Sequence, residues 1–358
     1  MKRLYSSRLP WHTPANRLAA LRERHAGYLD LTVSNPTQAG IHYPADLLDA
    51  LRDPRMLTYE PAAAGLRLAR EAVSAYYARR GAQVDPERIL LTASTSEAYS
   101  YLFKLFCDPG DEVLVPRPSY PLFELLAELD AVRVAHYTMF YDGHWSIDQL
   151  PVTERTRAII AVSPNNPTGS LADLDRLRAP GLPVIVDEVF ADYAPRQAMV
   201  DDAFYLNGLS KIAGLPQMKL GWIVYPEQHR DALELIADTY LSVSAPVQYA
   251  ALQWLPQADA IQQQIRERCR VNEAWLRARL RGTALTPLRI DGGWTIPVEI
   301  PQLRSEEDVV CALLEQQQVL VQPGYFYDFP REAYLVLSLL TRPDILEEGV
   351  RRIVDTIG

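Results

Sequence analysis

The sequence has little cysteine. Three cysteines occur in 358 residues, at Cys107, Cys269 and Cys311, and no two of them form a C-x-x-C pair. An odd and widely spaced set argues against a disulfide framework and against a cysteine-rich metal site. We therefore expect a reducing, cytoplasmic compartment and no structural metal.

Long hydrophobic runs are also absent. The longest apolar stretches, such as AIIAVS, PVIV and AYLVLSLL, are much shorter than the roughly 20 residues that a membrane helix needs. The first residues, MKRLYSSRLPWHTPANRL, are basic but lack the apolar segment of a secretory signal. We expect no membrane partner and no export.

The sequence lacks an excess of basic residues. Lysine and arginine total 36 against 45 aspartate and glutamate residues, so the net charge is −9. A nucleic-acid partner usually requires a basic surface, and this balance argues against one. With 48% hydrophobic and 23% charged residues, the composition is that of a globular protein. We expect a small-molecule substrate.

Strand-like and helix-like patterns alternate through the first two thirds of the chain. Helical spacing occurs at 62–80, 96–107, 121–131 and near 171–178, and short apolar runs of strand type occur at 88–94, 111–116, 132–137, 157–163, 183–188 and 203–210. Such alternation predicts an α/β fold with a mostly parallel sheet covered on both faces. Two long helices are predicted over 227–254 and 257–282, followed by shorter elements.

Candidate chemical groups follow the predicted strands, where ligands bind in parallel sheets. Lys211 follows FYLNGLS, and Asp187 ends PVIVD. Ser94, Thr95 and Ser96 follow ILLTA and open a helix, so their N–H groups and hydroxyls suit an anion. Each feature alone has a commoner explanation: a surface lysine, a turn cap and an ordinary N-cap.

The stretch NGLSKIAGLPQMKLGW, residues 207–222, resembles the cofactor-lysine signature of class I and II aminotransferases. Tyr59 ahead of GLRLAREA, SYPLF (119–123), SPNNPTG (163–169) and VDEVFADY (186–193) occur in that family's order. The resemblance covers about residues 30–340. It implies a homodimeric enzyme of fold type I that uses pyridoxal 5′-phosphate (PLP).

The resemblance also implies a domain organisation. A large PLP-binding domain, 45–250, would hold a mostly parallel seven-stranded sheet flanked by helices. A smaller α/β domain would combine 1–44 with 251–358.

The resemblance assigns two central roles. Lys211 would hold PLP as a Schiff base and, once released, serve as the base for the proton shift. Asp187 would keep the pyridine nitrogen protonated, which makes the ring an electron sink.

The remaining roles concern the rest of the cofactor. Implied cofactor-binding residues are Ser94, Thr95, Ser96, Ser210 and Lys219 at the phosphate, Tyr120 on the ring face, Asn166 at O3′, and Tyr59 at the phosphate of the neighbouring subunit.

Four positions depart from the family pattern. Ser94 stands where glycine is common, and Lys219 replaces an arginine, exchanging a bidentate fork for a point charge. Phe190 stands where a tyrosine usually donates to O3′, with Tyr193 close by in sequence. Val336, in YLVLSLL, aligns with the arginine that usually binds the substrate carboxylate.

The last departure bears on substrate. Asn35 and Arg342 are the nearest replacements for the missing arginine, although Arg342 is equally explained as a solvated loop residue. We therefore expect weak affinity for simple amino acids.

The predicted function is transfer of an amino group from an amino donor to a keto acceptor. Two alternatives stay open: a PLP-dependent lyase, decarboxylase or cyclase on the same fold, and a catalytically silent binding domain.

Overall fold

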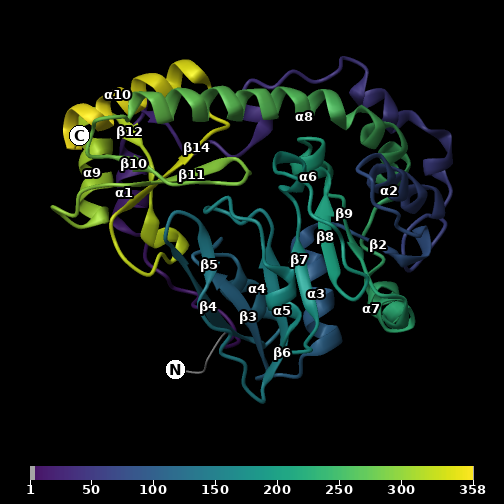
Figure 1. Ribbon diagram of the computed structural model, residues 1–358. Helices are drawn as coiled ribbons and strands as arrows, with labels where there is room; N and C mark the ends of the chain where they lie inside the picture. The colour runs from purple at the N-terminus through teal and green to yellow at the C-terminus, as the bar shows by residue number, and fades with distance from the viewer. Residues whose placement is uncertain (1–4, 358) are drawn as a thin grey trace.

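The computed structural model describes residues 5–357. It contains an eight-stranded sheet, a four-stranded sheet and a two-stranded pairing. Figure 1 shows the larger sheet low in the molecule and the smaller one at the upper left, with the long helix α8 (Ala245–Arg279) running above both.

The large sheet is mostly parallel, as predicted. Its order is β2-β9-β8-β7-β6-β3-β4-β5. The strands are β2 (Ile89–Thr92), β9 (Gly221–Val224), β8 (Phe204–Gly208), β7 (Val184–Asp187), β6 (Thr156–Val162), β3 (Glu112–Arg117), β4 (Arg133–Tyr141) and β5 (Trp145–Ile147). It has eight strands rather than seven because β5, a three-residue edge strand, returns antiparallel to β4. A strand of three residues is too short to show the alternation of apolar and polar residues by which strands are predicted.

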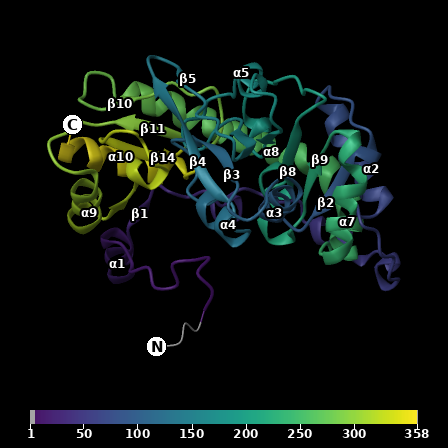
Figure 2. The ribbon, with the colours of Figure 1, turned by 90° about the horizontal axis from the view of Figure 1, so that it is seen from below.

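Helices cover both faces of this sheet (Figure 2). They are α2 (Arg67–Arg79), α3 (Thr95–Phe106), α4 (Phe123–Leu129), α5 (Leu174–Arg178), α6 (Leu209–Ile212) and α7 (Arg230–Tyr240). One hydrophobic cluster contains side chains of α2, α5 and α8, and another contains those of α3, α4 and α7. Strands that lie between two apolar layers consist of continuous hydrophobic residues, because both of their faces are buried. Such runs are visible in the sequence, so these strands could be predicted.

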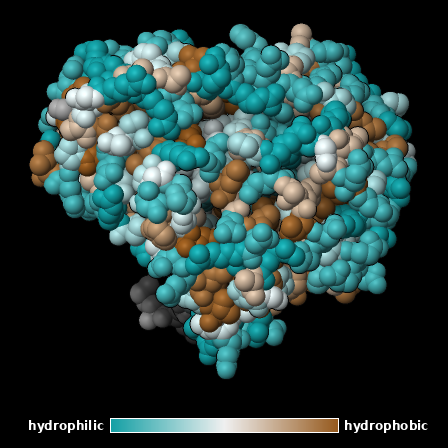
Figure 3. Space-filling view, in the orientation of Figure 1, coloured by the Kyte–Doolittle hydropathy of each residue, from teal (hydrophilic) through white to brown (hydrophobic). Residues whose placement is uncertain are grey.

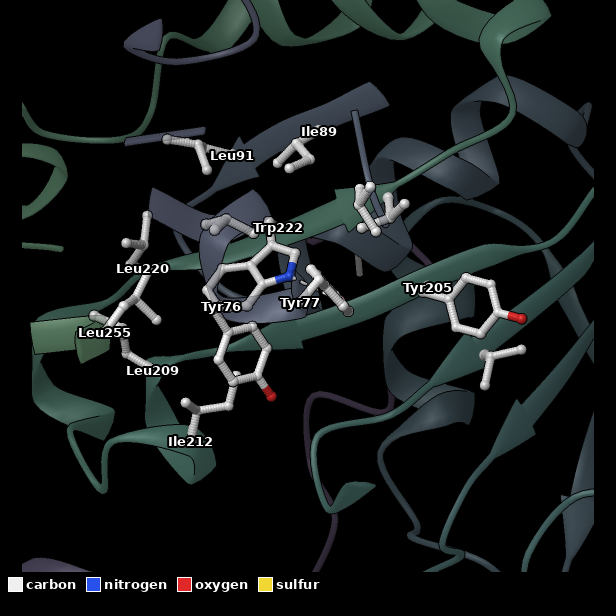
Figure 4. Packing of buried hydrophobic residues seen from close by; sticks show 14 of the residues in the cluster. Tyr76, Tyr77, Ile89, Leu91, Tyr205, Leu209, Ile212, Leu220, Trp222 and Leu255 are labelled. Carbon is white, nitrogen blue, oxygen red and sulfur yellow. Dashed lines mark hydrogen bonds between the residues drawn. The ribbon is translucent and has the colours of Figure 1, made fainter. Parts of the chain in front are cut away.

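Trp222 occupies the centre of the first cluster (Figure 4). Its indole Nε1 donates a 3.1 Å hydrogen bond to the hydroxyl of Tyr77, so a large aromatic side chain is buried with its polar atom satisfied. Helix α2 begins at Arg67 rather than near 62, after Gly65 with its φ of +87°. A Cβ at Gly65 would lie 2.6 Å from Leu91 Cδ1, so both backbone and space require glycine.

The predicted helices 227–254 and 257–282 are wrong in their boundaries. The break falls earlier, at Leu241, whose left-handed φ of +44° ends α7, and α8 then continues through Pro256 to Arg279. Proline removes one backbone hydrogen bond from a helix interior. Burial of Trp254 and Leu255 against the large-sheet cluster holds the helix together at that point.

The small antiparallel sheet has the order β10-β11-β14-β13. Its strands are β10 (Thr286–Pro287), β11 (Thr295–Glu299), β14 (Tyr334–Ser338) and β13 (Gln322–Pro323), and α9 (Glu306–Gln317) and α10 (Pro343–Ile357) belong to the same region. The N-terminal segment joins it, with α1 (Arg17–Arg24) packed on α9 and β1 (Leu29–Asp30) paired with β12 (Val319–Leu320).

Helix α8 packs against both regions in turn. Ala258 belongs to the large-sheet cluster, whereas Ile261 and Ile265 belong to the cluster that includes the small sheet. The predicted domain boundary at 250/251 therefore falls inside a continuous helix. The division into domains stays a prediction.

The face of the molecule drawn in Figure 3 is mostly hydrophilic, with scattered apolar side chains. Within residues 5–357, no helix combines the length and the apolar character needed to cross a membrane.

Candidate active site

The predicted site residues follow strands that point the same way. Strands β3, β6, β7 and β8 are parallel, and β2 shares their direction because β9 runs antiparallel to both β2 and β8. Their carboxyl ends therefore lie along one edge of the sheet. Asp187 is the last residue of β7, and just after the other strand ends come Ser94, Tyr120, Asn166 and Lys211.

Lys211 lies on the one-turn helix α6, and its amine lies beside a pair of aromatic rings. Its Nζ is 5.3 Å from the centre of the Trp294 ring and 5.6 Å from that of Phe190. Burial lowers the pKa of Lys211, and the negative charge of Asp187 opposes that shift. A buried amine of lowered pKa supplies the neutral nucleophile that attack on an aldehyde requires.

Asp187 is a carboxylate with fixed orientation. Its Oδ1 accepts the N–H of Val189 at 3.2 Å, and its Oδ2 accepts the hydroxyl of Tyr99 at 3.0 Å. Burial raises the pKa of Asp187 to about 6, and these two hydrogen bonds oppose the rise. A cation beside this carboxylate would offset its desolvation. A protonated pyridine nitrogen fits that requirement.

The start of helix α3, Ser94–Ser96, is a candidate anion cradle. Ser94 caps the helix, its Oγ accepting the N–H of Glu97 at 3.2 Å, while the Glu97 carboxylate accepts the N–H of Ala93 at 2.7 Å. These contacts resemble a capping box, except that the Glu97 carboxylate binds the N–H of the residue before the cap. The N–H groups of Thr95 and Ser96 lie in the first turn, where no intrahelical carbonyl faces them.

A glycine makes room for this cradle. A Cβ at Gly221 would lie 2.9 Å from the carbonyl carbon of Ser94 and 3.0 Å from the nitrogen of Thr95. Lys219, two residues earlier, is exposed and has a left-handed φ of +51°. Ser210 lies half-buried in α6. Both residues lie in the connection between β8 and β9, and the contact of Gly221 with Ser94 and Thr95 places the end of that connection beside the cradle.

Three further predicted residues differ in exposure. Asn166 is half-buried, and its Oδ1 accepts the hydroxyl of Thr295 at 3.3 Å, which leaves the amide nitrogen as its donor end. Tyr120 is 48% exposed and Tyr59 is 79% exposed. Tyr59 is the more exposed of the two, so its side chain is accessible to a second molecule.

Tyr193 does not act as a free donor in place of the missing Tyr at 190. Its hydroxyl donates to the backbone carbonyl of Lys211 at 2.7 Å. Phe190 instead packs edge-on against Trp294, with ring centres 5.2 Å apart.

A different donor, Trp294, lies at the site and was not predicted from the sequence. This residue is buried, and its Nε1 has no hydrogen-bond partner among residues 5–357. Leaving a buried N–H unpaired costs roughly 1–3 kcal/mol, so this group beside Lys211 is a candidate donor to a ligand. No motif marks it.

Val336 stands where the carboxylate-binding arginine was expected. Val336 is buried in a cluster with Leu288, Tyr327, Phe329 and Tyr334.

Arg342 and Asn35, the two candidates to bind the substrate carboxylate, each bond to a residue two positions further along the chain. Arg342 is exposed and pairs with Asp344 at 2.7 Å, and the Oδ1 of Asn35 accepts the N–H and hydroxyl of Thr37. Neither side chain is free of partners.

The chain matches the model of the family "Aminotransferase class I and II" over residues 26–353. It belongs to that family. The family and fold predicted from the sequence are thereby confirmed.

Curated relatives and solved structures agree with this assignment. Glutamate-pyruvate aminotransferase AlaA of Haemophilus influenzae is 28% identical, covering 98% of this chain and 94% of its own. Alanine aminotransferase of Mycobacterium tuberculosis is 26% identical, covering 98% and 89%. An alanine aminotransferase structure from Pyrococcus furiosus has a TM-score of 0.83 at 24% identity, covering 94% of each chain. A mutant Thermus thermophilus aspartate aminotransferase also has a TM-score of 0.83, at 23% identity over 99% of each. At these identities the structures establish the fold.

Proposed function

We propose that this protein is a PLP-dependent aminotransferase in which Lys211 binds the cofactor covalently. One observation carries the proposal: the half-buried amine of Lys211, whose pKa is lowered, lies within the field of the half-buried carboxylate of Asp187 at the end of a parallel strand. Bound PLP would supply an electron sink that stabilises negative charge developing at the substrate Cα.

Asp187 and Lys211 would perform the proton chemistry. Asp187, oriented by Tyr99 and Val189, would hold a proton on the pyridine nitrogen through an ion pair. The Nζ of Lys211, when not bonded to the cofactor, would serve as the base that accepts the proton from the substrate Cα and as the acid that donates it back. Asn166 and Trp294 would donate hydrogen bonds at this end of the site.

The α3 cradle would anchor the phosphate. Backbone N–H groups and hydroxyls of Ser94, Thr95 and Ser96 face an anion at a helix N-terminus, supported by Ser210 and Lys219. Tyr120 would stack on the ring. The high exposure of Tyr59 supports a homodimer in which this residue reaches the phosphate bound by the partner subunit.

The amino donor and the keto acceptor would be small molecules. The curated relatives are named for glutamate, pyruvate and alanine, and such compounds form the first panel to test. Val336 offers no guanidinium to a substrate carboxylate, so we expect Michaelis constants at or above about 1 mM for alanine and aspartate. Three dispersed, free cysteines support a cytoplasmic location.

A donor panel tests the proposal. Each amino acid is added to the PLP-loaded protein, and the cofactor spectrum and the products are followed. Conversion to the pyridoxamine form, with release of the matching keto acid, is the expected result.

Two other results would overturn this function. Release of ammonia or carbon dioxide would favour the lyase or decarboxylase that Phe190 and Val336 also permit. No response to any amine would favour a binding domain.

A further inference from the structure

Helix α6, which carries Lys211, cannot fix its own position. It has one turn, Leu209–Ile212, and the carbonyl of Leu209 accepts both the Ala213 and the Leu215 N–H, at 3.0 and 3.1 Å. The carbonyls of Lys211 and Ile212 lie at the end of the helix, where no intrahelical N–H follows them. External donors must satisfy these two groups.

Two buried side chains supply those donors. The hydroxyl of Tyr193, on the turn after β7, donates to the Lys211 carbonyl at 2.7 Å. The Nε2 of Gln262, on α8, donates to the Ile212 carbonyl at 3.0 Å. Tyr193 is 8% and Gln262 is 3% exposed. Two consecutive carbonyls at the lysine are thus held from two separate elements.

The surrounding groups fix the orientation of the Gln262 amide. Its Nε2 also donates to Oδ2 of Asp192 at 3.0 Å, and its Oε1 accepts from Arg266 at 3.2 Å. A flipped amide would turn its oxygen toward two acceptors, so only one orientation is favourable.

Asp192 is itself held in place. It accepts the hydroxyl of Tyr76 at 2.7 Å and pairs with the Nε of Arg80 at 3.1 Å. Fully partnered buried polar networks of this kind are rigid. The network therefore connects α2 and α8 to the lysine helix.

Tyr193 also packs against the aromatic ring beside the lysine amine. Its ring packs edge-on against Trp294, with centres 5.0 Å apart, and the Nζ of Lys211 lies 5.3 Å from the Trp294 ring centre. One tyrosine therefore sets both the backbone of Lys211 and the aromatic wall beside its amine.

We propose that Tyr193 and Gln262 are positioning residues that clamp α6 and so direct the Nζ of Lys211 toward the cofactor aldehyde. The inference deepens the proposed function and rests on it. A reacting group displaced by about 1 Å loses on the order of 10²-fold in rate, so a loosened α6 slows the capture of PLP.

The test compares Tyr193→Phe and Gln262→Leu with a matched control, Tyr137→Phe. Tyr137 is another buried tyrosine whose hydroxyl donates to a backbone carbonyl, that of Ile160 at 2.9 Å in the large sheet. Tyr193→Phe removes one oxygen and keeps the ring against Trp294, so it preserves the packing even if Gln262→Leu fails to fold.

Two measurements are made on cofactor-free protein: the rate of covalent capture of added PLP as a function of pH, and amide hydrogen exchange in residues 209–215. We expect Tyr193→Phe to slow capture by about tenfold or more and to accelerate exchange in that segment, with the control unchanged. Wild-type capture and wild-type exchange in Tyr193→Phe would overturn the clamp.

The two proposals fail in distinguishable ways. If the wild-type protein captures no PLP, the proposed function fails, while the exchange measurement still decides whether Tyr193 and Gln262 hold α6. If the wild type captures PLP and the variants match it, only the clamp fails.

Discussion

The hydroxyl of Tyr99 donates a 3.0 Å hydrogen bond to Oδ2 of Asp187. Tyr99 lies in the middle of α3, the helix whose first turn forms the anion cradle. The same helix therefore orients the carboxylate and, in the proposed function, would present N–H groups to the phosphate. The spacing between these two groups along α3 would then set the distance between the ends of the ligand.

Asp187→Asn should lower kcat/KM by at least tenfold, or about 1.4 kcal/mol in barrier, because an amide cannot hold a proton on the pyridine nitrogen by charge. Tyr99→Phe, which keeps the carboxylate and loses its orienting hydroxyl, should lose less. Steady-state kinetics of both variants check this order. A loss below tenfold in Asp187→Asn would mean that Asp187 is structural.

The stability of the cofactor-free protein should depend on pH through Asp187. Burial raises the pKa of its carboxyl from 3.8 to about 6, so between these values the folded state binds more protons than the unfolded state. Stability then falls as pH rises through that window. Urea unfolding of wild type and Asp187→Asn across it isolates this contribution, because Glu188 and Glu306, whose pKa values burial also raises, are present in both. Parallel curves for the two proteins would contradict the account.

Gly221→Ala should weaken PLP binding by about tenfold or more, because the new Cβ would lie 2.9–3.0 Å from backbone atoms of Ser94 and Thr95 and would displace the cradle. The matched control is Gly349→Ala, where the Cβ would meet Leu31 at 2.8 Å, in the region of α10. Fluorescence titration with PLP distinguishes them. Equal losses in both variants would indicate a general loss of stability.

Tyr59→Phe should reduce PLP affinity by a factor corresponding to one hydrogen bond to a charged group, about 1.5–3 kcal/mol, with covalent attachment to Lys211 preserved. The control is Tyr5→Phe, at another exposed tyrosine, whose ring packs tilted against that of Trp11. Analytical ultracentrifugation should show a dimer. A fully active monomer would refute the role given to Tyr59.

The sequence predicted the residues that follow strands. Lys211, Asp187 and the Ser94 segment come after buried apolar runs, so their place at one edge of the sheet follows from strand direction. Their roles, by contrast, came only from the resemblance to a family.

Residues recruited from elsewhere could not be predicted. Tyr99, Gln262 and Trp294 lie within helices or next to a strand of the other sheet, and each contacts the site across a long sequence separation. Such contacts depend on how the helices and strands pack together, and the hydrophobic periodicity of each segment does not predict that packing. The error at Pro256 has a similar origin, since packing of α8 outweighs the local preference of proline.

The covalent role of Lys211 can be measured directly. The chain has four lysines, Lys2, Lys104, Lys211 and Lys219. Borohydride reduction of the PLP-loaded protein, followed by peptide mass mapping, fixes the label on whichever lysine carries the cofactor. The account predicts a pyridoxyl group on Lys211 alone, and none in Lys211→Ala. A label on Lys104 or Lys219 in its place, or no label on a protein that binds PLP, would contradict it.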